Sequence, residues 1–261
     1  MKRALFLLAV VLACSCAEAK TGVLAPMGQD ENSIQAIMKR AGITKMDEIV
    51  IFDNLRDMQM ALRAGRIDRF STGSHTAGYV AMRNKDFGVL VNTRNAIVGY
   101  SLAMLPENSP TMNAINSAII RMKSDGTLER LVHDNIIKAS GKDPIAVKMP
   151  KTKGKGVLRV AVTGDLPPMD CILADGTPAG FNTAFLAELS RRIGQTIELV
   201  SMSAGARQAA LASGRVDAVF WTRSFYDNKR RKTQAIDDTE GLIVSEPYIF
   251  ESRAIVSLKK D

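Results

Sequence analysis

The chain has 261 residues, enough for one large domain or two modest ones. Its composition, 46% hydrophobic and 24% charged, excludes a disordered, collagen-like or coiled-coil chain. The formal net charge of +8 permits anionic partners without choosing among them, and aromatic residues, at 5%, offer little for stacking on nucleic-acid bases.

Residues 1–19 have the pattern of a secretory signal. Two basic residues precede an apolar run over 4–13, which is too short to span a membrane. Two processing sites compete: an Ala-x-Ala site ending at Ala19 leaves a free exported protein, whereas the residues before Cys14 resemble a bacterial lipoprotein signal, which would leave Cys14 acylated. The sequence therefore predicts a periplasmic or otherwise extracytoplasmic protein, secreted by a signal peptide and either free or lipid-anchored.

Few side chains remain that could hold a metal. Two of the three cysteines lie in the signal, so Cys171 is unpaired unless Cys16 survives processing and finds it. His75 and His133 are the only histidines. The sequence predicts no disulfide framework, no metal site and no cofactor.

An internal repeat organises the chain. Residues 60–68 and 209–217 share Ala, Leu, Gly, Arg and Asp in the same order. Each copy predicts a helix, a glycine at its C-terminal end and then a strand. Apolar runs at 49–52 and 197–200 precede the copies and predict strands. Each half thus carries strand–helix–strand, which predicts an α/β fold of two lobes, each an open, mostly parallel sheet flanked by helices.

The segment between the repeats predicts two helices and a linker. A helix opens at Ser109-Pro110, and a shorter one follows the turn at 125–127. Residues 139–156 are polar, basic and interrupted by proline and glycine, which is typical of a linker.

The second half begins with a buried strand over 157–162. Phe181 to Ile193 then follow a helical period, with Asn182 as the predicted N-cap and Gly194 as the stop.

From residue 157 onward the chain resembles the type II periplasmic solute-binding proteins, in the polar-amino-acid-binding family (family 3). The matching features, in the family's order, are 158–162, Pro167-Pro168, 175–176 with 180–182, 211–217 and 245–248. Residues 22–134 resemble the remainder of the same family, through 52–54, 62–68 and 123–128.

These segments come in permuted order, so the resemblance implies a circular permutant. Residues 20–92 would form lobe 2, and 93–138 a hinge crossing and helices returning to lobe 1. The basic linker at 139–156 would join the ancestral termini, and 157–261 would form lobe 1. The alternative is a fragment of two tandem binding units, which could also exchange halves as a swapped dimer. Only the crossing near 92–105 would be continuous, which predicts a softer hinge.

Ligands of open α/β sheets bind beyond the carboxyl ends of the strands, so we expect the site in the interlobe cleft. Arg223 could hold a ligand carboxylate and Trp221 could stack on the ligand, although Trp221 could equally be a core residue and Arg223 solvated. The lobe 1 candidates are Asp165, Met169, Asp170, Trp221, Thr222, Arg223 and Ser224.

The lobe 2 candidates lie where strands turn into helices, because backbone N–H groups at a helix start suit an anion. They are Met27, Gln29, Thr72, Ser74 and His75. His75 is otherwise a surface loop histidine. Asp68 and Asp217, which the repeat pairs, are expected to have structural roles.

The chain departs from the family where the ammonium of an amino acid would bind. The resemblance implies an aspartate there, and the alignment places Gly73 at that position. Lys229 and Arg230 compete with Arg223 for the carboxylate. An ammonium without a counter-charge in a closed cleft is costly, which favours an uncharged or anionic ligand.

The resemblance implies a binding protein, not an enzyme, which captures an amino acid or related small polar molecule for a membrane ABC-type importer. A sensor or partner-binding scaffold without a transport role stays open, as does a dehydratase-like enzyme with Asp165, Asp170 or His75 as acid or base. The basic run at 229–232 predicts a solvated surface, and export argues against a nucleic-acid partner. We expect a monomer or domain-swapped dimer that contacts membrane only through a lipid anchor at Cys14.

Overall fold

The computed structural model describes residues 19–40, 47–154, 156–227 and 232–259. Residues 1–18, which hold most of the predicted signal and Cys14, lie outside these ranges, as do Lys229 and Arg230 of the basic run. No helix among the described residues combines the length and the apolar character needed to cross a membrane.

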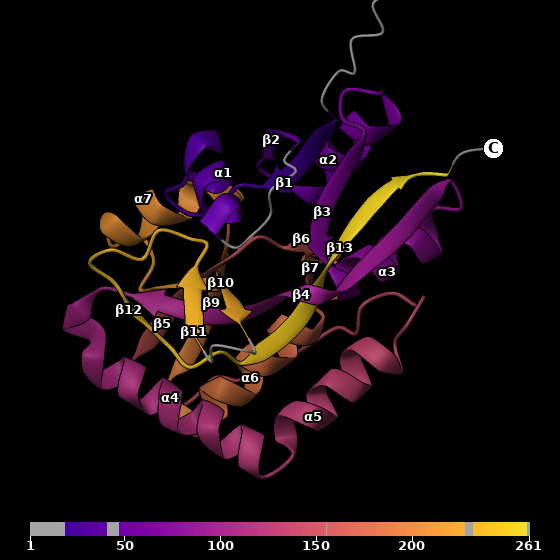
Figure 1. Cartoon of the computed structure of the whole chain (residues 1–261). Coiled ribbons are helices and arrows are strands. Elements are labelled where there is room, and N and C mark those ends of the chain that lie inside the picture. Colours follow the sequence, from indigo (N-terminus) through magenta and orange to yellow (C-terminus); the bar gives the residue numbers. More distant parts are fainter. Residues whose placement is uncertain (1–18, 41–46, 155, 228–231, 260–261) are drawn as a thin grey trace, which may run out of the picture.

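One sheet of ten strands runs through the molecule (Figure 1). The strands of its main path are, in spatial order, β2 (Glu48–Phe52), β1 (Lys20–Leu24), β3 (Arg69–Gly73), β13 (Ile249–Leu258), β4 (Phe87–Met104), β10 (Ala218–Asp227), β5 (Val157–Val162) and β9 (Thr196–Ser201). Two strands lie off this path: β11 (Lys232–Ala235) pairs with β10, and β12 (Ile243–Val244) pairs with β4. A small second sheet consists of β6 (Asp165–Leu166), β7 (Asp170–Ile172) and β8 (Pro178–Ala179).

The main sheet is parallel at both ends and antiparallel in the middle. Strand β1 pairs in parallel with β2 and β3, and we term these three strands the first parallel part. Strand β5 pairs in parallel with β10 and β9, and these form the second parallel part. The α/β class is confirmed, but the two parts share one sheet instead of forming separate ones.

Helices cover both parallel parts. The first part carries α1 (Glu31–Arg40), α2 (Leu55–Arg63) and α3 (Ser74–Arg83). The rest of the chain carries η1 (Pro106–Asn108), α4 (Ser109–Ser124), α5 (Thr127–Val132), η2 (His133–Ile137), α6 (Phe181–Ile193), η3 (Ala204–Ala206) and α7 (Arg207–Ala212). In Figure 1, α4 and α5 lie at the opposite end of the molecule from α1 and α2, and both pack against α6.

Strands β4 and β13 together join the two parallel parts. Residues 87–92 of β4 pair with 253–258 of β13, and 97–100 pair with 249–252. Strand β13 also pairs with β3, so it extends well into the first part. The prediction of one continuous crossing is wrong, because the segment 249–258 is long enough to run beside β4 through both parts. The predicted softer hinge therefore loses its basis.

The repeat is confirmed as a structural unit. Helices α2 and α7 each end before a left-handed glycine, Gly65 at φ 66° and Gly214 at φ 68°. The two aspartates that follow fix neighbouring strands. Asp68 accepts a hydrogen bond from the Lys20 backbone N–H at 2.7 Å, and Asp217 accepts one from the Arg159 backbone N–H at 2.8 Å. Both aspartates thus have the structural role that the repeat predicted.

Helix α6 begins and ends where the sequence predicted, but its N-cap is different. Gly180 occupies the cap, and a Cβ added there would lie 2.5 Å from the Pro168 carbonyl oxygen. Asn182 is instead buried in the first turn, where its amide donates to Asp170 at 3.1 Å. The predicted cap is wrong because the side chain finds a buried carboxylate rather than the helix end.

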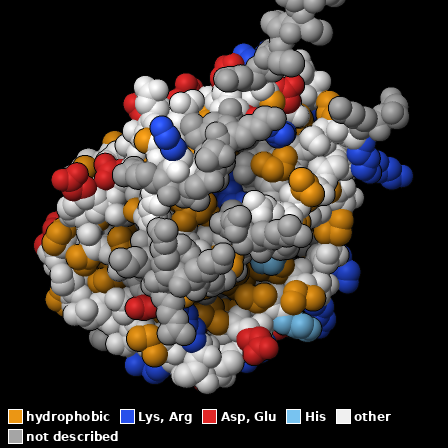
Figure 2. All heavy atoms as spheres, in the orientation of Figure 1, with side chains coloured by type: hydrophobic (Ala, Val, Ile, Leu, Met, Phe, Trp, Pro, Cys, Tyr) orange, Lys and Arg blue, Asp and Glu red, His pale blue; other side chains and the backbone are white. Residues whose placement is uncertain are grey.

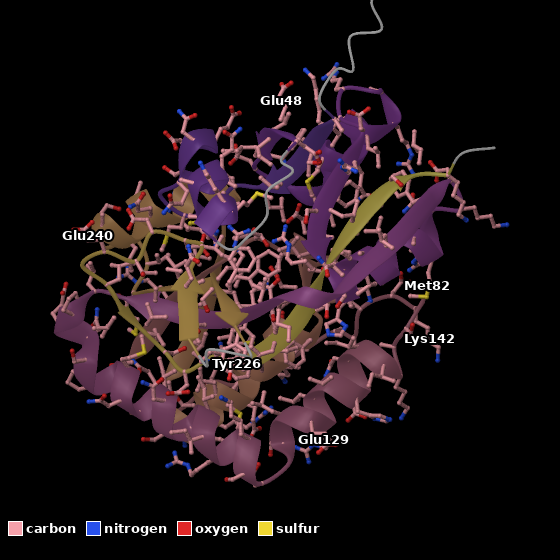
Figure 3. The ribbon with its side chains drawn as sticks, viewed as in Figure 1. Glu48, Met82, Glu129, Lys142, Tyr226 and Glu240 are labelled. Carbon is pink, nitrogen blue, oxygen red and sulfur yellow. The ribbon has the colours of Figure 1, made fainter. Side chains whose placement is uncertain are left out.

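The predicted linker packs against β8 of the small sheet and β9 of the main sheet. The Val147 N–H donates to the Pro178 carbonyl at 2.8 Å, and the Thr152 N–H donates to Thr196 Oγ1 at 3.0 Å. Just before the linker contacts β8 and β9, the chain touches the end of α3, where Met82 and Lys142 lie near each other in Figure 3. There Ser140 Oγ lies 3.5 Å from Met82 Sδ.

Candidate functional site

The carboxylate of Asp237 links the two parallel parts. It accepts a hydrogen bond from the Met27 backbone N–H at 2.5 Å, in the turn between β1 and α1. It also accepts one from the Arg223 backbone N–H at 2.5 Å, in β10. We term Met27, Arg207, Arg223 and Asp237 the junction cluster. Two of its four members, Met27 and Arg223, are candidates from the sequence.

The Arg223 guanidinium is buried and engaged. Its Nε and Nη2 donate to the two oxygens of Asp237 at 3.2 and 3.1 Å. Its Nη1 and Nη2 also reach the carbonyl oxygens of Leu24 and Ala25 at 3.3 and 3.2 Å. Arg223 is therefore not solvated, and it binds a carboxylate of the protein itself in the two-point manner expected for a ligand.

A second buried arginine leaves the junction cluster with excess positive charge. Arg207 is 1% exposed, and its Nη2 lies 3.9 Å from Asp237 Oδ1. Its other donors reach backbone carbonyls, among them that of Phe220 at 3.1 Å. Burial alone would raise the pKa of Asp237, but the two guanidinium groups hold that pKa below its ordinary value. One carboxylate thus serves two buried cations.

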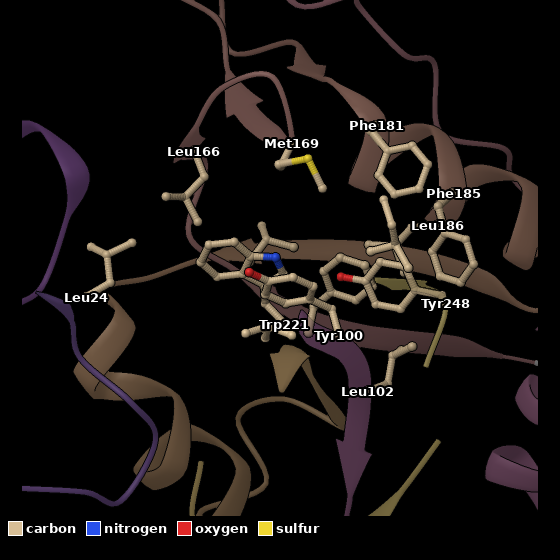
Figure 4. Packing of buried hydrophobic residues seen from close by; sticks show 14 of the residues in the cluster. Leu24, Tyr100, Leu102, Leu166, Met169, Phe181, Phe185, Leu186, Trp221 and Tyr248 are labelled. Carbon is tan, nitrogen blue, oxygen red and sulfur yellow. The ribbon is translucent and has the colours of Figure 1, made fainter. Parts of the chain in front are cut away.

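Trp221 lies beside the junction cluster in an unusual backbone conformation. Its φ of 70° falls in the left-handed region, at an irregularity in the pairing of β10 with β4 between Val219 and Thr222. Its ring stacks on Tyr100 with centroids 5.0 Å apart, as Figure 4 shows. Trp221 is 5% exposed, so it belongs to the core. Strained conformations of this kind are concentrated at functional sites.

A buried glutamate reaches the position where the sequence lacks an acidic residue. Glu251 of β13 accepts a hydrogen bond from the His75 N–H at 3.1 Å, at the start of α3. A Cβ added to Gly73 would lie 1.9 Å from Glu251 Oε1, so a larger residue there would displace the glutamate side chain. A carboxylate carried by β13 therefore lies beside Gly73.

Several buried polar atoms around these groups have no hydrogen-bond partner within the described ranges. Burying a polar atom without a partner costs free energy. They are Thr72 Oγ1, Thr76 Oγ1, Asn182 Oδ1, Trp221 Nε1, Thr222 Oγ1, Tyr248 Oη and Glu251 Oε1. Thr72, Trp221 and Thr222 are candidates from the sequence.

Three further candidates have structural contacts. Asp165 accepts a hydrogen bond from the Leu55 N–H at 2.7 Å, at the start of α2, and burial raises the pKa of Asp165 to about 6. Asp170 is buried and accepts from the Gly164 N–H at 2.7 Å, and burial raises its pKa as well. Met169 is wholly buried in the core near Phe181 (Figure 4).

The remaining candidates are half-buried. Gln29 lies in the turn before α1, and Ser224 lies in β10 opposite Gly99. Ser74 and His75 line a cavity of about 300 Å³ between α3 and the region of Ile136.

Arg207, Asp237 and Glu251 were missed by the sequence analysis. Asp237 follows Arg223 by only 14 residues, but no local pattern in the sequence shows that their side chains pair. In the described part of the chain, no three His, Cys, Asp or Glu side chains gather as a metal site would require. On the face drawn in Figure 2, the Lys and Arg side chains of described residues lie at separate places and do not merge into one basic patch.

One known family matches part of the chain. Residues 158–261 match the family described as bacterial extracellular solute-binding proteins, family 3. No curated protein matches the chain.

Solved structures with a similar fold include binding proteins of import systems. One is the ligand-binding component of an ABC-type import system from Staphylococcus aureus, with 12% identity and a TM-score of 0.43, covering 92% of this chain. The chain spans only 65% of that protein. A periplasmic substrate-binding protein of an ABC transporter from Coxiella burnetii has 12% identity and a TM-score of 0.41, with coverage of 92% and 84%. The ancestral amino-acid-binding protein AncCDT-1, a precursor of cyclohexadienyl dehydratase, has 12% identity and a TM-score of 0.43, with coverage of 94% and 83%.

Proposed function

We propose, since residues 158–261 match family 3 of the bacterial extracellular solute-binding proteins, that the chain binds a small polar solute outside the cytoplasm. The solute lies between the two parallel parts and is handed to an ABC-type importer in the membrane. The protein acts as a binding protein and not as an enzyme. Export by the segment 1–19, with or without acylation of Cys14, brings it to that compartment.

The observation that carries this proposal is the bidentate ion pair between Arg223 and Asp237. With the Met27 N–H on the same carboxylate, the junction cluster has the donors that bind a solute carboxylate from both sides. Asp237 holds the molecule closed without solute. A solute carboxylate takes its place on Arg223 when the two parts separate and close again.

Glu251 supplies a counter-charge for an ammonium group on the same solute. Tyr100 is near both charges: burial raises its pKa well above the ordinary value, Glu251 raises it further, and Arg253 and Arg223 lower it. A solute that carries a carboxylate and an ammonium group therefore meets complementary charges near Tyr100. This favours an amino acid, and it reverses the preference for uncharged or anionic ligands that Gly73 suggested.

The experiment follows the fluorescence of Trp221, the only tryptophan in the chain, during titration with amino acids. Each amino acid is compared with its methyl ester, which keeps the side chain and ammonium but lacks the carboxylate. We expect a saturable change and a higher melting temperature with at least one amino acid, and neither with its ester. Equal binding of acid and ester would contradict the proposal, as would a full set of amino acids without effect.

A variant separates the two charges of the solute. Glu251→Gln should lower the affinity for an amino acid by about tenfold or more. The affinity for the corresponding acid without the amino group should stay unchanged. If the affinities for both ligands fall equally, Glu251 does not bind the ammonium group of the solute.

A further inference from the structure

A cavity of about 260 Å³ is lined by α1 and the first parallel part of the sheet. Its walls are mainly apolar side chains from α1, the sheet and the β10–β11 region, among them Val23, Ile34, Ile37, Phe225 and Ile255. Ligand pockets combine such apolar walls with a few placed polar groups. The polar groups of this cavity include three arginines.

Two of the three arginines are neutralised by the protein itself. Arg69 holds both oxygens of Asp47, with Nη2–Oδ1 at 2.6 Å and Nε–Oδ2 at 2.8 Å. Arg223 holds both oxygens of Asp237. Their charges are therefore balanced at the cavity wall.

Arg253 of β13 is the exception. Its Nη2 and Nε donate to Ser71 Oγ at 2.5 and 3.2 Å, and no carboxylate in the described ranges makes an ion pair with it. Ser71 orients the guanidinium without neutralising it. Burial lowers the pKa of Arg253, and the nearby Arg223 lowers it further, against the opposite effects of Tyr100 and Glu251. A cation in apolar surroundings without a paired anion is costly, and a bound anion would offset that cost.

We propose that this cavity is a second binding site, which takes a small carboxylate with an apolar tail. The tail lies among the isoleucines of α1 and the sheet, and the carboxylate binds Arg253 in the place of a missing counter-ion. The site lies on the α1 face of the sheet and shares Arg223 in its wall with the proposed solute site, but its ligand binds Arg253. It requires no ammonium group on its ligand.

Isothermal titration with octanoate tests this site, with octan-1-ol and octylamine as probes of the same tail. We expect saturable binding of octanoate and binding at least about tenfold weaker for the alcohol and the amine. Equal affinity for octan-1-ol would overturn the proposal, because the tail alone would then account for binding.

Arg253→Gln should lower the affinity for octanoate by about tenfold or more. The control is Arg215→Gln, at an exposed turn in the other parallel part, which should leave this affinity unchanged. If Arg253→Gln fails to fold, Arg253→Lys retains the charge without the two-point geometry and should weaken octanoate by a smaller factor. Ile37→Phe, which fills the cavity, should also abolish octanoate binding. Unchanged octanoate affinity in Arg253→Gln or in Ile37→Phe would refute the site. If no amino acid binds, the expected results with octanoate stay the same, because octanoate tests this cavity and not the proposed solute site.

Discussion

Asp237 and Arg223 form a buried ion pair in which both carboxylate oxygens meet the guanidinium, at 3.1 and 3.2 Å. The same carboxylate accepts the Met27 N–H from the other parallel part, so one side chain fixes the relative position of the two parts. Breaking a buried pair on one side leaves a charge that nothing compensates, which is more costly than the pair itself is stabilising.

Asp237→Ala should therefore lower the free energy of unfolding by about 3–5 kcal/mol, because Arg223 and Arg207 would share the interior without a carboxylate. Urea denaturation measures the loss. The matched control is Asp238→Ala, since Asp238 is the half-buried neighbour whose carboxylate accepts from the Glu240 N–H at 3.0 Å.

Addition of formate to the Asp237→Ala variant tests whether the junction cluster binds a carboxylate. A small carboxylate that enters the space left by Asp237 should raise the melting temperature of Asp237→Ala and leave the parent protein unaffected. If formate acts equally on both proteins, the junction cluster is not a carboxylate site.

Gly73→Ala tests the contact between β3 and Glu251. The added methyl group would lie 1.9 Å from Glu251 Oε1, so the carboxylate must move from its place at the start of α3. We expect a loss of about 1–3 kcal/mol in the free energy of unfolding. Gly78→Ala is the control: nothing lies within 4 Å of its Cβ, and alanine in the middle of α3 should stabilise by about 0.5–1 kcal/mol. Equal effects of the two substitutions would argue against the close approach.

Trp221→Phe separates packing from ligand contact. The ring can still stack on Tyr100, and the buried Nε1–H without a partner disappears, so we expect the free energy of unfolding to change by less than about 1 kcal/mol. Trp221→Ala should cost about 3–5 kcal/mol, because it removes the ring. If Nε1 donates to the solute, Trp221→Phe weakens amino-acid binding in a thermal-shift titration; unchanged binding would restrict Trp221 to the core.

Local patterns in the sequence predicted the elements of the fold. The helical period of Phe181 to Ile193, closed by a left-handed Gly194, is visible without any tertiary information. The repeat likewise predicted a helix, a glycine turn and a strand in both halves. These features depend on neighbours within a few residues, which is why they could be read from the chain.

The junction cluster could not be read in that way. The Asp237 carboxylate contacts Arg207 and Arg223, which lie on separate elements. It also accepts a hydrogen bond from Met27, which is 210 residues from Asp237 in the sequence. The same holds for Glu251. Its place beside Gly73 depends on how β13 pairs with β3, which the local sequence does not show. Arg223 and Met27 were expected at the site because strand ends meet in space, but the internal partner that occupies them has no local signature.

The pH dependence of stability provides the last test, through Asp165. Burial raises the pKa of this carboxyl to about 6 in the folded protein, against about 3.9 in an unfolded chain. Between these values the folded state binds more protons than the unfolded state, so stability falls as the pH rises from 4 to above 6. The pKa of Asp170, also raised by burial, acts in the same direction.

Asp165→Asn removes one of these contributions and keeps an oxygen that can accept from the Leu55 N–H. We expect the variant to lose less stability than the parent between pH 4 and pH 7, by up to about 2–3 kcal/mol, in urea denaturation at several pH values. The exposed Glu107→Gln serves as the control and should follow the parent curve. A parent and an Asp165→Asn curve that run parallel across this range would show that Asp165 titrates alike in both states. Burial would then not favour the protonated carboxyl in the folded protein.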